Sequence, residues 1–210
     1  MEPSHIIILT LYLGVLGHLA GSALDLRALQ IVTKPVASAA FIAFALHSNC
    51  LGTPAGVVYL AALVMSFLGD VFLISRSLTM FRAGLISFLL GHVLFILAFM
   101  ITGIDKQQTL VGLIGMVPVS LLISKWILPQ TPKNMKAKVL AYIIVITLMV
   151  AFSFGTGNMF VTKAAVLFYI SDITVARDRF VQKSILNTIL GSPMYFTAQL
   201  MFAAASGGAI

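Results

Sequence analysis

Two aspartates stand a hundred residues apart, each inside a long apolar run of this sequence. Asp70 lies within residues 67–73 (FLGDVFL), and Asp172 lies within residues 168–173 (FYISDI). The run around Asp70 is otherwise uncharged over residues 55–74, which is long enough to cross a bilayer as a helix. A carboxylate inside a membrane costs a few kcal/mol unless it faces protein or water, and such acids are usually functional. The two aspartates are therefore the first candidates for chemistry.

Two carboxylates held close together cannot both ionise readily, so one could donate a proton while the other acts as a base. That pair suits acid-assisted addition of water to a bond in a membrane-embedded substrate. It equally suits a proton relay in a transporter of lipids or small solutes. The sequence contains no GxSxG, HExxH or P-loop motif, so a serine nucleophile, a metal centre or a phosphate loop is not expected.

A third class, the intramembrane aspartyl proteases, also pairs aspartates on two helices. Their GxGD motif would need glycine where Phe67 stands, and their proline-alanine-leucine signature is absent. This class therefore ranks below hydrolysis of a lipid and below transport.

Composition indicates an all-α, polytopic membrane protein. The 210 residues are 60% hydrophobic and 9% charged, with a mean hydropathy of +1.08, whereas soluble domains carry about 25% charged residues. The net charge of +7 is explained by loop lysines and arginines that set topology, so no nucleic-acid partner is expected. Cys50 is the single cysteine and cannot form an internal disulfide.

The apolar runs predict eight transmembrane helices in one domain that covers residues 1–210. The first run has no basic residue before it and no cleavage site, so it is expected to be a retained helix. Only a few residues separate the sixth and seventh runs, which should form a helical hairpin. The expected spans are 6–23, 31–46, 55–74, 81–101, 109–128, 139–154, 159–176 and 193–209.

Basic residues are divided unevenly between the two sides of this topology. The first, third, fifth and seventh connections hold 11 of the 13 lysines and arginines, and only Lys106 and Lys163 fall on the other side. The positive-inside rule then makes those four connections cytoplasmic and places both termini on the non-cytoplasmic side. The expected location is a multi-pass position in a membrane, the inner membrane if the source is bacterial.

The two aspartates share a predicted depth. Asp70 precedes Arg76 by six residues and Asp172 precedes Arg177 by five, which puts each about 7–9 Å below the cytoplasmic interface. A parallel repeat of four plus four helices would explain this match, although the other helix pairs show little similarity.

Other polar groups fall at similar depth. Ser192 and Pro193 read as the cap and first residue of the eighth helix, with residues 179–190 forming a short amphipathic helix along the interface. His18 and Gln199 are each explained by interhelical hydrogen bonds. The basic residues near the connections, including Lys34, Arg76, Arg82 and Arg177, are explained first as topology determinants.

The chain resembles the YhhN family of lysoplasmalogenase-like membrane proteins over nearly its whole length. The order and spacing of several motifs carry the resemblance, with Phe95 and Phe196 standing where tyrosines are common. The motifs are Lys34-Pro35, Gly69-Asp70, Phe81-x-x-Gly84-Leu85-x-x-Phe88-x-x-x-His92, Ser171-Asp172 followed by Ala176-x-x-x-Phe180, and Tyr195-x-x-x-Gln199.

This resemblance implies hydrolysis of the vinyl ether bond of lysoplasmalogen without a cofactor, yielding a fatty aldehyde and glycerophosphoethanolamine or glycerophosphocholine. It implies Asp70 and Asp172 as the catalytic acids, in either order of roles, within a lipid bilayer and on a lysophospholipid substrate. Lys34 is the expected partner of the substrate phosphate, with Arg76, Arg82 and Arg177 as weaker candidates.

The same reading predicts a cavity between the third and seventh spans on which both carboxylates converge. His92 and Tyr195 would orient the ether oxygen or the water, and His92 and Gln199 would line the cavity. The cavity should open toward the cytoplasmic side or laterally into that leaflet. Each acid must reach its proton directly or through one water for the pair to cooperate.

Overall fold

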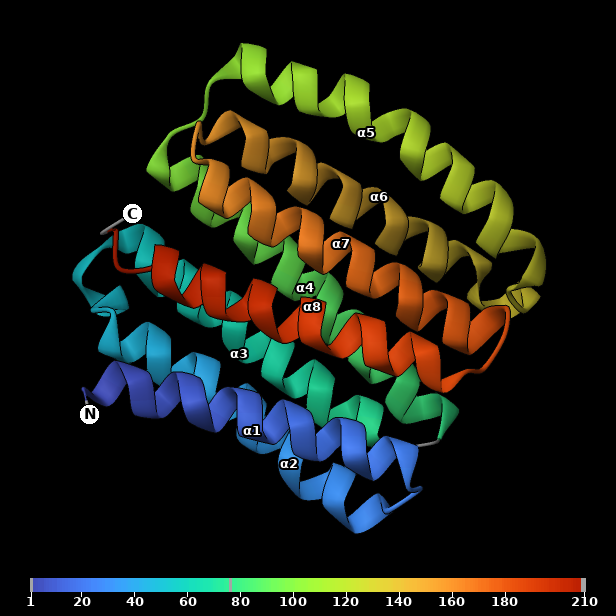
Figure 1. Ribbon diagram of the computed structural model, residues 1–210. Helices are drawn as coiled ribbons and strands as arrows, with labels where there is room; N and C mark the ends of the chain where they lie inside the picture. The colour runs from blue at the N-terminus through green and yellow to red at the C-terminus, as the bar shows by residue number, and fades with distance from the viewer. Residues whose placement is uncertain (1, 76, 209–210) are drawn as a thin grey trace.

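The structure is a computed structural model that describes residues 2–75 and 77–208, so Arg76 lies outside the described residues. Over these residues the chain forms eight long α-helices, two short 3₁₀ turns and no strand (Figure 1). The helices are α1 Pro3–Ala23, α2 Arg27–His47, α3 Pro54–Ile74, α4 Leu78–Thr102, α5 Lys106–Ile127, α6 Lys133–Gly155, α7 Met159–Phe180 and α8 Ile185–Ala205.

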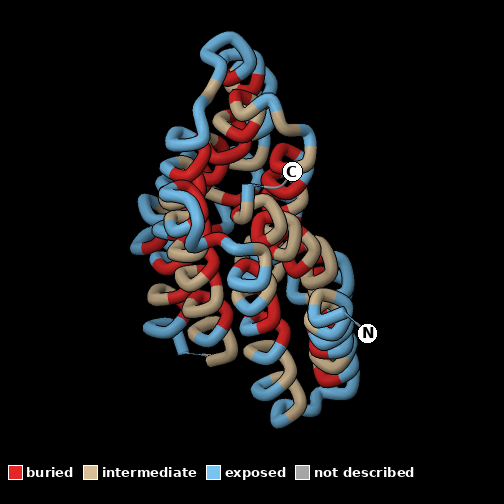
Figure 2. Tube along the Cα trace, turned by 90° about the vertical axis from the view of Figure 1, so that its left-hand side faces the viewer, coloured by how far each residue is buried: buried red, intermediate tan, exposed pale blue. Residues whose placement is uncertain are grey.

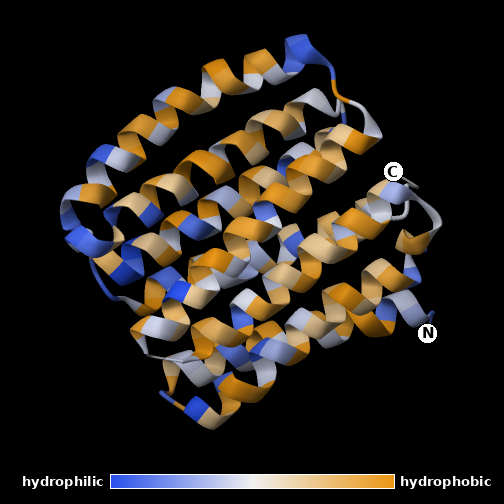
Figure 3. Cartoon of the chain, turned by 180° about the vertical axis from the view of Figure 1, so that it is seen from behind, coloured by the Kyte–Doolittle hydropathy of each residue, from blue (hydrophilic) through white to orange (hydrophobic). Residues whose placement is uncertain are grey.

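Seven of these helices, α1 to α7, are long and apolar enough to cross a bilayer. Apolar residues cover the shafts of the helices, and hydrophilic residues gather at their ends (Figure 3). The chain is therefore a multi-pass helical membrane protein, as its composition predicts. α8 equals α1 to α3 in length but carries Asn187 and Gln199, and it is not among the seven, so an eighth span remains a prediction.

Polar caps explain why several helices begin earlier than the apolar runs. The Ser77 hydroxyl accepts a hydrogen bond from the backbone N–H of Met80 at 3.1 Å, and the Asp105 carboxylate accepts one from Gln108 at 2.8 Å. Such caps satisfy backbone N–H groups that have no partner in the first turn. The structure thus adds a polar turn or more to α4, α5 and α6 before the predicted apolar segments begin.

The start of α8 differs from the sequence-based expectation. The helix begins at Ile185, with Ser184 as its cap, and Pro193 lies in its interior. The preceding helix α7 continues to Phe180, so residues 179–190 do not form a separate interfacial helix. The Asp178 carboxylate accepts a hydrogen bond from the Ser184 N–H at 3.0 Å and so helps close the turn between α7 and α8. An interior proline is tolerated in a membrane helix, which the prediction of a start at Pro193 did not consider.

The helices are arranged as four antiparallel hairpins, α1 with α2, α3 with α4, α5 with α6, and α7 with α8 (Figure 1). The hairpins also pack through α2 against α8 and through α6 against α4. These two contacts are equivalent if the chain consists of two four-helix halves related by a two-fold axis. Within the described residues, the contact of α1 with α8 has no comparable counterpart between α5 and α4, so the four-plus-four repeat stays a prediction.

An aromatic cluster fills the interior near the end of the bundle where α8 ends. Tyr59 packs edge-on against Phe95 and Phe99, and the rings of Phe95 and Phe202 stack with centroids 4.2 Å apart. Buried residues continue along the inward faces of the helices, while most outward faces are exposed (Figure 2). The well-packed core thus lies away from the turns that precede α2, α4, α6 and α8.

Candidate active site

A cavity of about 1120 Å³ occupies the opposite half of the bundle. Every helix contributes to its wall, and both Asp70 and Asp172 line it. The lining also includes Asp25, Ser75 and Gln182, which lie in the turns after α1, α3 and α7. The cavity therefore reaches from the interior to the end of the bundle that is expected to face the cytoplasm.

Asp70, one turn before the end of α3, is buried and held by three side chains. Its Oδ1 lies 3.1 Å from the ammonium Nζ of Lys34. Its Oδ2 accepts hydrogen bonds from the Ser38 hydroxyl at 2.7 Å and from the Tyr195 hydroxyl at 2.6 Å. Lys34 and Ser38 are four residues apart on α2 and so share one face of that helix. An ammonium group and two hydroxyl donors therefore surround the Asp70 carboxyl.

Asp172, in the middle of α7, has a different environment. Its Oδ2 accepts a hydrogen bond from the Tyr142 hydroxyl at 2.6 Å and lies 3.7 Å from Nε2 of His92. Its side chain is 17% exposed, compared with 2% for that of Asp70. Among the described residues, no lysine or arginine forms an ion pair with Asp172. Of the two acids, Asp172 is the more accessible from the cavity.

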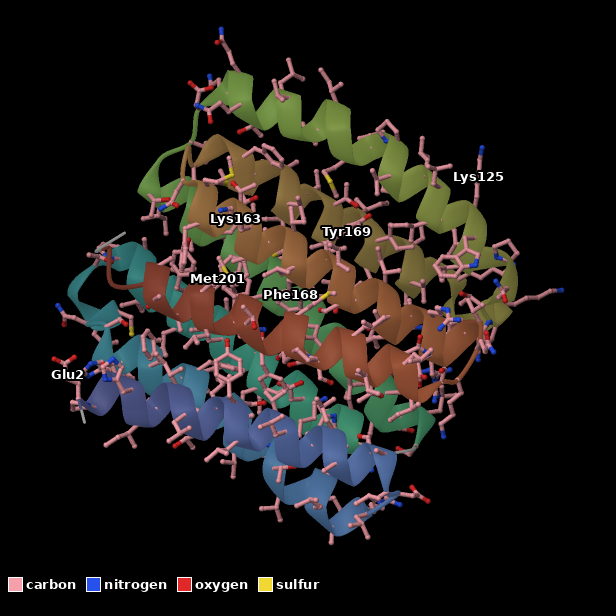
Figure 4. All side chains as sticks on the ribbon, viewed as in Figure 1. Glu2, Lys125, Lys163, Phe168, Tyr169 and Met201 are labelled. Atoms are coloured by element: carbon pink, nitrogen blue, oxygen red, sulfur yellow. The ribbon has the colours of Figure 1, made fainter. Side chains whose placement is uncertain are left out.

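One aromatic ring connects the partners of the two aspartates. The Phe168 ring centroid lies 5.3 Å from that of Tyr195 and 4.7 Å from that of His92. Phe168 and Tyr169 lie side by side in the middle of α7, where α8 crosses in front of α4 (Figure 4). Within the described part of the chain the two carboxylates share no direct hydrogen bond. Both line the same cavity.

The partners of each aspartate come from equivalent helices of the two halves. Asp70 on α3 is bound from α2 and α8, and Asp172 on α7 is approached from α6 and α4. The two sets of partners differ in charge, because among the described residues only Asp70 has a lysine or arginine partner, Lys34. The partners therefore come from corresponding helices but give the two aspartates different electrostatic surroundings.

The structure places the predicted site residues in two groups. Lys34 and Tyr195 line the cavity and bind Asp70, as described above. His92 and Gln199 are fully buried and are not among the cavity-lining residues, so the prediction that they line it is wrong. His92 is packed behind Phe168 and edge-on to Tyr142, and approaches Asp172 from there.

The remaining candidates also have defined positions. His18 lines the cavity. Arg82 contacts the sulfur of Met135 at 3.4 Å, and Arg177 donates hydrogen bonds to Asn187 and Gln182. Neither arginine lines the cavity.

Sequence reasoning missed Ser38 and Tyr142, the hydroxyl partners of the two aspartates. Each carried a usable signal, because Ser38 follows Lys34 by one helical turn and Tyr142 is the single tyrosine of the sixth helix. A lone hydroxyl in an apolar helix was not sufficient to link either residue to a particular carboxylate. Nowhere in the described residues do three His, Cys, Asp or Glu side chains gather in a group that could hold a metal ion.

Fold and site together define a multi-pass helical membrane protein in which two aspartates line one cavity. The model of the YhhN family matches residues 29–206, a range that includes both aspartates and all of their partners. The chain belongs to the YhhN family. Neither the curated proteins nor the solved structures contain a match to this chain.

Proposed function

We propose that this protein is an intramembrane hydrolase that cleaves the vinyl ether bond of lysoplasmalogens. Membership of the YhhN family supports the proposal, and one structural observation carries it. The two aspartates line the same cavity, but within the described residues only Asp70 is paired with a lysine or arginine. Acid-catalysed hydration of a vinyl ether needs such a difference, since one group must give a proton and another must remain charged.

The difference in partners supports a division of roles. Asp70 lies beside the Lys34 ammonium and accepts hydrogen bonds from Ser38 and Tyr195, so its partners suit it to stabilise a developing positive charge. Asp172, which is more exposed and without a lysine or arginine partner in the described chain, is then the proton donor. Tyr142 holds the Asp172 carboxyl through Oδ2, and Oδ1 is available to carry the proton.

Hydration of the double bond proceeds in two proton transfers. Asp172 gives its proton to the vinyl carbon that is not bonded to oxygen, and the adjacent carbon–oxygen unit becomes an oxocarbenium ion. The Asp70 carboxylate stabilises this cation and positions a water molecule. The water oxygen bonds to the cationic carbon while one of its protons returns to Asp172. In the resulting hemiacetal the glycerol oxygen then gains a proton and the hydroxyl loses one, so that the carbon–oxygen bond to glycerol breaks and aldehyde and glycerophosphate ester are released.

The size of the cavity suits part of a single-chain lipid. Its volume of about 1120 Å³ is slightly above the range of about 300–1,000 Å³ for ligand pockets. The buried rings of Phe95, Phe99 and Phe202 at the other end of the bundle do not line it. A transporter with alternating access would also show a cavity closed at one end, so hydrolysis is proposed from the two aspartates and the family rather than from this shape.

Product analysis by mass spectrometry tests the proposal. Purified protein is incubated with matched lysolipids that carry a vinyl ether, a saturated ether or an ester at the same position. Aldehyde should appear with the vinyl ether alone, and Asp172→Asn should lower its rate about 10²–10⁴-fold, the usual contribution of a general acid. Absence of aldehyde from folded wild-type protein, or full activity of both Asp172→Asn and Asp70→Asn, would refute it. Flux driven by a proton gradient in liposomes without any covalent product would instead support a transporter.

A further inference from the structure

Three lysines and arginines line the cavity, namely Lys34, Arg179 and Lys183. Lys34 lies deep on α2, and the other two lie at the mouth, at the end of α7 and in the turn that follows. The cavity is otherwise lined by apolar and uncharged polar groups and by four aspartates. An anion in the cavity is therefore expected to bind next to one of these three side chains.

Lys34 already has an anionic partner, because its ammonium lies 3.1 Å from Asp70. A phosphate bound by Lys34 would compete with that carboxylate. Arg179 and Lys183, in contrast, form no hydrogen bond or ion pair with any side chain of the described chain. Their positive charges are available to a ligand.

An aromatic ring packs against one face of the Arg179 guanidinium group. The guanidinium carbon lies 4.3 Å from the ring centroid of Phe81, a buried residue that also lines the cavity. Such a cation–π contact holds the planar group over the ring and leaves its N–H donors free at the edges. A guanidinium presented in this way is suited to the bidentate binding of a phosphate.

Two carboxylates, those of Asp178 and Asp25, also lie at the mouth of the cavity. In the described chain neither forms an ion pair with Arg179 or Lys183. Asp178 Oδ1 accepts hydrogen bonds from the backbone N–H of Ser184 at 3.0 Å and from the side chain of Asn187 at 2.8 Å, so this group serves to close the turn. Asp25 lines the cavity from the turn after α1.

Arg179 and Asp172 are placed to act on one ligand. They are seven residues apart on α7, which brings them to the same face of the helix at a separation of about 10 Å along its axis. The long side chain of arginine can reduce that separation. The proposed proton donor therefore lies two turns deeper in the cavity than the free cations.

We propose that Arg179 and Lys183 form a binding site for the phosphodiester anion of a single-chain phospholipid. This site rests on the proposed function, because it places the head group at the mouth and the ether bond beside Asp172. From the sequence we expected Lys34 to bind the phosphate. In the structure the Lys34 ammonium is paired with the carboxylate of Asp70.

Binding of lipids that cannot react tests this site separately from catalysis. Full-length protein in detergent is titrated with a saturated 1-O-alkyl lysophospholipid and with the corresponding uncharged 1-O-alkylglycerol, in competition with a fluorescent lysolipid. The double variant Arg179→Gln/Lys183→Gln should raise the Kd of the phospholipid about tenfold or more, as expected for loss of a charge-assisted hydrogen bond. Its Kd for the alkylglycerol should stay unchanged, which also shows that the variant is folded.

Lys133→Gln/Lys138→Gln is the matched control, since both lysines are exposed at the same end of the bundle and neither lines the cavity. The site is refuted if the control variant weakens phospholipid binding equally, or if the Arg179/Lys183 variant binds both lipids as wild type does. Equal affinity of wild type for inorganic phosphate and for the lysophospholipid would also overturn it, because the site would then bind free phosphate. Head-group-dependent binding without aldehyde release from a vinyl ether would refute the proposed function and leave this site standing.

Discussion

The pair of Lys34 and Asp70 gives the sharpest prediction for the stability of the site. Lys34→Met removes the ammonium that lies 3.1 Å from Oδ1 of Asp70 while keeping the apolar stem of the side chain. Asp70 is 1% exposed, so water solvates its charge poorly once the cation is removed. Removing one partner of a buried ion pair costs about 3–5 kcal/mol. For a chain of this length that corresponds to a decrease in Tm of about 6–20 °C.

A double-mutant cycle separates the pair from the rest of the cavity. Asp70→Asn should destabilise the protein for the complementary reason, because it leaves the Lys34 ammonium without its carboxylate. The double variant Lys34→Met/Asp70→Asn contains neither charge and should recover most of the lost stability. Thermal unfolding of the four proteins in one detergent, followed by circular dichroism, measures the coupling.

Additive losses in this cycle would contradict the reasoning, since they would show that the two charges do not depend on each other. A Tm of Lys34→Met equal to that of wild type would contradict it as well. The Lys34→Met variant also tests the expectation, made from the sequence, that Lys34 binds the substrate phosphate. If its apparent affinity for lysophospholipid equals that of wild type, Lys34 does not bind the phosphate.

Three further substitutions test individual contacts. Tyr142→Phe removes the 2.6 Å hydrogen bond to Asp172 and should slow aldehyde release while costing only about 1 kcal/mol of stability; unchanged kcat would exclude a positioning role. Gly69→Ala would place a methyl group 2.6 Å from the ring of Phe88. The resulting overpacking should lower the free energy of unfolding by about 1–3 kcal/mol. An unfolding free energy equal to that of wild type would show that the ring moves freely. Gln199→Leu replaces a buried amide that does not line the cavity and should leave the rate of aldehyde release unchanged. A large loss of that rate at unchanged Tm would show that Gln199 belongs to the substrate site.

Length and hydropathy were sufficient to predict the all-helical fold and the first seven helices. The period of apolar residues and the polar connections carry that information directly, and α3 ends at Ile74 as predicted. The start of α8 was missed because its signal is local. Ser184 caps the helix and Pro193 occupies its interior, whereas the sequence offers Ser192-Pro193 as an equally good start.

The aspartates were predictable and their partners were not. A carboxylate in an apolar run is expensive and therefore conspicuous, which identifies Asp70 and Asp172 without a structure. A hydroxyl in a helix is cheap and common, so nothing in the sequence links Ser38 to Asp70 or Tyr142 to Asp172. These links depend on which helices of the two halves become neighbours.

The prediction for His92 shows the same limit. Its spacing from Gly84 and Phe88 correctly placed it on the inward face of the fourth helix, and it is fully buried. Periodicity indicates the inward face but not which groups stand between that face and the cavity. The rings of Phe168 and Tyr142 pack against His92, and of these two Tyr142 lines the cavity.

Hydrolysis of a vinyl ether lysolipid in D₂O tests the central claim most directly. Protonation of carbon by Asp172 delivers one solvent-derived hydrogen to the carbon next to the aldehyde, and water supplies the carbonyl oxygen. We predict that aldehyde trapped by immediate reduction carries a single deuterium at that carbon, and that Asp172→Asn lowers the rate of its formation about 10²–10⁴-fold. Aldehyde without deuterium, or deuterated aldehyde formed at the wild-type rate by Asp172→Asn, would contradict the assignment of Asp172 as the proton donor.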